Sequence, residues 1–81
     1  MTKKETKVLS FITEEYIIGS KLGEIDSPSN IAKRASKLVN DKVSSAYVEF
    51  MFEGFKHNPL MQNYIKNLQP QDFVKFTLVQ K

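Results

Sequence analysis

Cysteine and tryptophan are absent from this chain of 81 residues, and arginine occurs only once, at Arg34. Without cysteine there can be no disulfide, no thiol nucleophile and no cysteine-bound metal, so the fold must depend on its apolar core or on a partner chain. No apolar run approaches the roughly 18 residues that a membrane-spanning helix needs. The first residues also lack the apolar segment and cleavage site of a secretory signal. We therefore expect one domain over residues 1–81, without a membrane association, in the cytoplasm (the host cytoplasm if the protein is viral).

Residue patterns that carry out chemistry are also scarce. The single histidine, His57, stands beside the Asn58-Pro59 pair, with no nucleophile and orienting acid in a recognisable arrangement. The carboxylates Glu49 and Glu53 are four residues apart, which on a helix is most simply a polar face. Calcium-loop, phosphate-loop and zinc spacings are missing. The sequence therefore predicts a protein that is not an enzyme, with no catalytic residue, metal, cofactor or small-molecule substrate.

Apolar residues make up 41% of the chain, enough for a folded domain, and their spacing predicts an all-α fold. We expect a small bundle of four to five short helices. The first covers residues 3–18, opens with a capping box between Thr2 and Glu5, and ends at Gly19. The second starts at residue 27 with the Ser-Pro pair, and the fourth at residue 58 with the Asn-Pro pair, because both pairs suit a helix N-terminus.

The third predicted helix, residues 42–55, is apolar over about two thirds of its circumference. A helix of this kind is either central to the core or shared with another chain. We expect it to lie at the centre, with Phe50 and Phe52 fully buried.

The segment 70–79 admits two interpretations. Pro70 and Asp72 are typical of a helix start, whereas "FVKFTLV" is rich in residues that favour strands. We favour a short helix over a strand that pairs across a dimer. The third helix, the fourth helix and this tail together carry more apolar residues than a small domain encloses, so we expect either a homodimer or a protein partner on this surface, a compact monomer being the alternative. The predicted interface residues are Met61, Tyr64, Phe73 and Phe76.

Residues 3–55 resemble the first three helices of helix-turn-helix and winged-helix DNA-binding domains, through "TKKETKVLSFI", "SPSNIAKRASKL" and "DKVSSAYVEFMFEGF". The octet "IAKRASKL" is also similar to a helix of the small omega subunit of RNA polymerase. The chain departs from the DNA-binding pattern in lacking a glycine after the second helix, in carrying Glu49 and Glu53 on the third, and in showing no two-stranded wing. The resemblance implies that Lys42, Ser44, Ser45 and Tyr47 face the major groove, with Lys33, Arg34 and Lys37 near the DNA backbone.

The charge composition is compatible with DNA binding but does not require it. Twelve basic and nine acidic residues give a net charge of +3. Eleven of the basic residues are lysine, and lysine lacks the planar fork with which arginine reads guanine or clamps phosphate. We therefore predict a small non-catalytic protein that acts by binding another protein, as a phage-type inhibitor or accessory regulator. The alternative prediction is a DNA-binding transcriptional regulator of the helix-turn-helix type.

Overall fold

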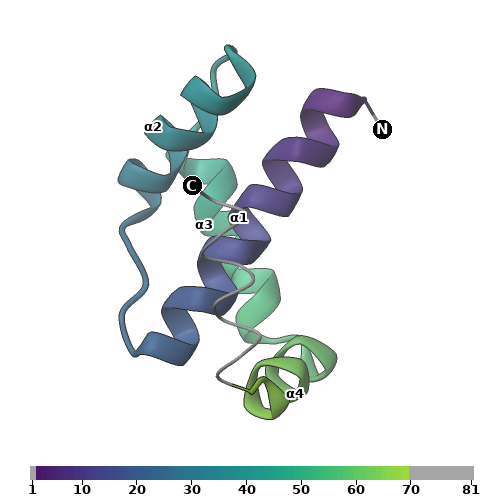
Figure 1. Cartoon of the computed structure of the whole chain (residues 1–81). Coiled ribbons are helices and arrows are strands. Elements are labelled where there is room, and N and C mark those ends of the chain that lie inside the picture. Colours follow the sequence, from purple (N-terminus) through teal and green to yellow (C-terminus); the bar gives the residue numbers. More distant parts are fainter. Residues whose placement is uncertain (1, 70–81) are drawn as a thin grey trace.

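The computed structural model describes residues 2–69, which form four α-helices and no strand (Figure 1). The helices are α1 (Lys3–Leu22), α2 (Pro28–Val39), α3 (Ser45–Lys56) and α4 (Pro59–Asn67). The prediction of a small all-α bundle is confirmed for these residues. The predicted element at 70–79 lies outside the described residues, and so do the interface residues Phe73 and Phe76.

Helices α1 and α3 each contact the other three helices, and α1 is the longer of the two and contributes more buried residues. Its side chains Val8 and Ile12 pack in one cluster with buried residues of α2 and α3. About one turn after Ile12, Tyr16 and Ile17 pack in a second cluster. Its other buried members are Ile65 of α4 and Leu68 at the C-terminal end of α4. A helix of 20 residues is long enough to join both clusters.

The third helix does contact all the others, but the expectation that Phe50 and Phe52 are fully buried is wrong. Only Val48 of α3 is buried, Phe52 is half-buried, and Phe50 is 74% exposed. The reason is geometric: α3 has 12 residues and packs on its neighbours along one side, so its broad apolar surface exceeds what these contacts cover.

The polar caps predicted from the sequence are present at the helix starts. Thr2 and Glu5 form the expected capping box. The side chains of Ser27 and Asn58 accept hydrogen bonds from backbone amides in the first turns of α2 and α4. Helix α3 begins later than expected, because Ser44 is its N-cap.

The end of α1 differs from the prediction. The helix continues to Leu22, and Gly23 is the C-cap, in the left-handed region with φ 84°. Gly19 is buried inside the helix, where its carbonyl oxygen accepts a hydrogen bond from Glu24 N at 2.8 Å. The chain therefore turns back over Gly19, and the absence of a side chain there makes room for Ile25.

Candidate functional site

Arg34, a predicted DNA contact, makes three contacts within the molecule. Its guanidinium forms ion pairs with Glu15 of α1 and with Asp26, the latter at 2.8 Å. It also lies over the ring of Phe11, 5.7 Å from the ring centroid. The Glu15 side chain is mostly buried, so its charge needs this partner. The single arginine therefore joins α2 to α1, with its side chain 46% exposed.

Asp26 is the second carboxylate that binds the Arg34 guanidinium. A hydrogen bond from the Asn30 side chain, one from the backbone amide of Ser27, and the nearby Arg34 guanidinium lower the pKa of Asp26 below its usual value. A carboxyl whose pKa is depressed by folding stabilises the fold above its unfolded pKa, and that contribution is lost as the pH falls through the folded pKa. The link between Arg34 and the Asp26 carboxylate is thus complete at neutral pH.

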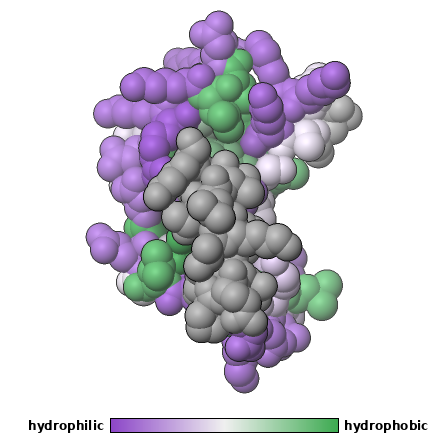
Figure 2. Space-filling view, in the orientation of Figure 1, coloured by the Kyte–Doolittle hydropathy of each residue, from purple (hydrophilic) through white to green (hydrophobic). Residues whose placement is uncertain are grey.

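The other predicted DNA contacts lie at the surface around the connection between α2 and α3. Lys33, Lys37 and Lys42 are exposed, and so are Ser45 and Tyr47. Hydrophilic side chains predominate in Figure 2 at the end of the molecule where α1 begins and α2 ends. The structure therefore leaves several lysines accessible there.

The turn after α2 has no glycine, as the sequence shows, but a left-handed residue is present there. Asn40 takes this conformation, with φ 51°, and asparagine tolerates it better than other non-glycine residues. Ser36 then fixes the connection, because its Oγ accepts a hydrogen bond from Val43 N at 2.9 Å. Ser44, a predicted base contact, instead caps α3 by accepting a hydrogen bond from Tyr47 N.

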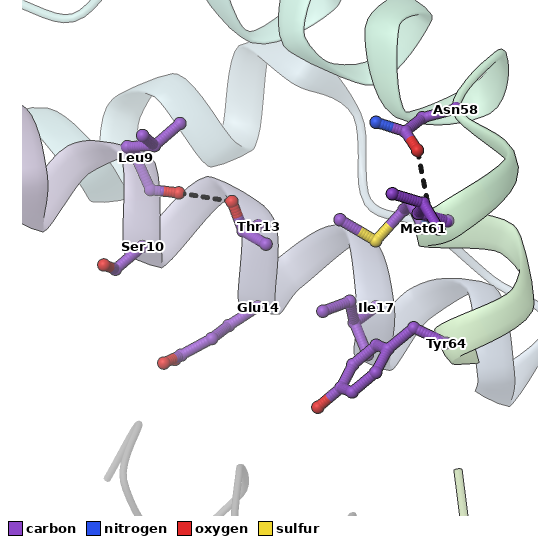
Figure 3. Close-up of a pocket in the computed structure, with 9 residues that line it drawn as sticks. Leu9, Ser10, Thr13, Glu14, Ile17, Asn58, Met61 and Tyr64 are labelled. Carbon is purple, nitrogen blue, oxygen red and sulfur yellow. Dashed lines mark hydrogen bonds between the residues drawn. The ribbon is translucent and has the colours of Figure 1, made fainter. Parts of the chain in front are cut away.

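A groove between α1 and α4 includes two of the predicted interface residues, Met61 and Tyr64 (Figure 3). It has a volume of about 620 Å³. Figure 3 shows Met61 and Tyr64 reaching from α4 toward Ile17 of α1. The groove is lined by Leu9, Ser10, Thr13, Glu14, Ile17, Asn58, Leu60, Met61 and Tyr64.

Polar side chains hold α4 in the position that forms this groove. Asn58 Oδ1 accepts a hydrogen bond from Met61 N at 3.1 Å and so fixes the first turn. The amide nitrogen of the Gln62 side chain donates to Tyr16 Oη at 3.0 Å and to the carbonyl oxygen of Phe55 at 2.9 Å. These bonds tie α4 to both α1 and the end of α3, so the groove has a fixed wall.

The groove is suited to binding apolar groups. Leu60 is 81% exposed on its rim, and Tyr64, one turn later, is about half exposed. On the α1 side, the hydroxyl of Thr13 donates to the carbonyl oxygen of Leu9 at 2.6 Å, so this polar group is already satisfied. Among residues 2–69 no group of three potential metal ligands comes together. The geometry of the groove therefore offers apolar contact area beside Leu60 and Tyr64.

Sequence reasoning found one side of this groove. Met61 and Tyr64 were predicted interface residues, and both line it. The α1 side was missed, because Leu9 belongs to the apolar stripe that was assigned to the core. The signal that could have found it is the width of this stripe, which exceeds what one neighbouring helix covers.

No protein-family model, curated protein or solved structure that was compared with the chain matches it. None of the helices in the described part of the chain is long and apolar enough to cross a membrane.

Proposed function

We propose that this protein is a non-catalytic binding protein, and that the groove between α1 and α4 receives apolar side chains of another protein. The observation that supports the proposal is the exposure of Leu60 and Tyr64 beside an apolar hollow. Burying a leucine side chain fully contributes about 1.5–3 kcal/mol, so covering these residues would favour association. A phage-type inhibitor or accessory regulator acts by binding its target, and the groove with its exposed Leu60 and Tyr64 is a surface suited to that role.

Site-specific photocrosslinking in the native host tests the groove. A photoreactive amino acid at position 60 should give one dominant adduct, and the same group at position 22 should not, because Leu22 is 70% exposed but does not line the groove. Nuclease treatment should leave the adduct unchanged. Leu60→Asp should reduce the capture of that partner at least about tenfold, as loss of a well-buried anchor does, with Leu22→Asp as the matched control.

The groove assignment is wrong if positions 60 and 22 yield the same adducts, or if position 60 yields none. A single adduct of twice the chain mass would identify the partner as a second copy of this protein. Helical circular dichroism of both aspartate variants would show that the fold is retained.

Duplex DNA is the second candidate ligand, and the left-handed Asn40 with the exposed lysines around it favours this reading. The triple variant Lys33→Gln, Lys37→Gln, Lys42→Gln should weaken such binding and reduce its dependence on salt, because each lysine that contacts a phosphate releases a counterion. Arg34 is left unchanged, since its loss would disturb the contact of α2 with α1. Absence of duplex binding by the wild type at low salt rules this candidate out.

A further inference from the structure

The outward face of α3 carries a second apolar surface that is independent of the groove. Ala46, Phe50 and Gly54 follow one another at intervals of four residues, so they lie along one line of the helix, and all three are exposed. A methyl group added at Gly54 would meet no atom within 4 Å, and the backbone there does not adopt a positive φ. No contact within the described chain therefore requires glycine at this position.

Negative charge borders this line. Glu49 and Glu53 lie beside Phe50, and both are exposed. The two carboxylates and Phe50 line a hollow of about 550 Å³, together with Phe52 and with Pro28 at the start of α2. The surface is thus a largely apolar hollow with two carboxylates in its lining, next to the line of Ala46, Phe50 and Gly54, and we call it the α3 face.

We propose that the α3 face binds a helix of a partner protein whose apolar stripe is flanked by lysine or arginine. Small side chains at Ala46 and Gly54 let the backbone of a second helix approach α3 closely, while Phe50 projects between the partner's side chains. Basic groups on the partner would lie opposite Glu49 and Glu53, and such complementarity favours the correct orientation.

The same charges disfavour two other occupants of the α3 face. In a symmetric pair of α3 helices, Glu49 and Glu53 of one copy would approach the same carboxylates of the other. Duplex DNA would bring phosphates against them. The inference rests on the proposed function in one respect, that this protein acts by binding another protein. It does not depend on the groove between α1 and α4, because no residue of α3 lines that groove.

A titration with designed peptides tests the inference. The probe is a synthetic amphipathic helix with a leucine stripe flanked by lysines, and its control carries glutamate in place of every lysine. In amide NMR spectra of the isotope-labelled protein, the lysine peptide should shift the signals of Ala46, Phe50 and Gly54. Phe50→Ala should weaken this binding at least about tenfold, as loss of a central aromatic anchor does, whereas the exposed control Leu22→Ala should not.

Two further variants separate this docking from a structural effect. The double variant Glu49→Lys, Glu53→Lys should reverse the preference, so that the glutamate peptide binds more tightly than the lysine peptide. Gly54→Ala should weaken the lysine peptide several-fold although the fold is retained, because the added methyl group holds the partner helix away.

The inference is overturned if the lysine peptide does not bind, if its shifts map outside α3, or if Phe50→Ala binds it as tightly as the wild type. Self-association that Phe50→Ala abolishes in sedimentation equilibrium would also overturn it, by assigning the face to a second copy. Photocrosslinking from position 60 tests the groove, and the peptide titration tests the α3 face. One proposal can therefore fail while the other is upheld.

Discussion

Replacing Ile12 with alanine should lower the free energy of unfolding by about 2–5 kcal/mol. Ile12 is completely buried at the middle of α1, in the cluster that includes the fully buried Ile31 of α2 and Val48 of α3. Its truncation removes contacts with two helices at once and leaves a cavity between them. Domains of this kind are stable by about 5–15 kcal/mol, so the loss is a large fraction of the total. Urea denaturation followed by far-ultraviolet circular dichroism measures it.

Two substitutions at exposed apolar positions provide the comparison. Leu22→Ala and Phe50→Ala should each change stability by about 0.5 kcal/mol or less, because neither side chain is part of the core. A cost for Phe50→Ala equal to that of Ile12→Ala would contradict the exposed position of Phe50 on α3.

Glycine to alanine substitution should have opposite effects at positions 19 and 54. At Gly19 the new methyl carbon would lie 2.8 Å from both the carbonyl oxygen of Glu24 and the Cα of Ile25, so the returning backbone must move. Overpacking of this kind costs about 1–3 kcal/mol. At Gly54 the methyl group meets open space, and alanine favours a helix interior over glycine by about 1 kcal/mol.

Thermal denaturation of the two single variants and the wild type checks this pair. The midpoint should fall for Gly19→Ala and rise for Gly54→Ala. If both variants are stabilised, the close approach of residues 24 and 25 to α1 is incorrect. If both are destabilised, Gly54 is required by the fold itself, and the open space beside it is not free for a partner helix.

The parts of the fold that could be predicted are those that depend on neighbouring residues in the sequence. The Ser27-Pro28 and Asn58-Pro59 pairs mark the starts of α2 and α4, because a side-chain cap and a missing amide act within one helical turn. The capping box of α1 is equally local. The spacing of apolar residues predicted the all-α class because it too is set by residues three and four positions apart.

The features that sequence reasoning missed depend on contacts across the fold. Gly19 was expected to end α1, yet Gly23 does so, because the backbone of the following loop needs the space beside Gly19. The ion pair of Arg34 with Glu15 was not anticipated, because the two residues are 19 positions apart on different helices. A stripe of apolar residues also does not reveal which part of it a neighbour will cover. That is why Phe50 was expected in the core, and why only the α4 side of the groove was anticipated.

The position of Arg34 within α2, where it is bound to Glu15 of α1, has a consequence for proteolysis. An arginine-specific protease has one target bond in the chain, between Arg34 and the fully buried Ala35 in the middle of α2. Proteases act on extended backbone, so the bond can be cut only in molecules in which α2 has opened. When reclosing is faster than cleavage, the rate of this single cut is proportional to the population of opened α2. The rate of this cleavage, followed by gel electrophoresis, therefore measures the local stability of α2 in the native protein without a label or a substitution.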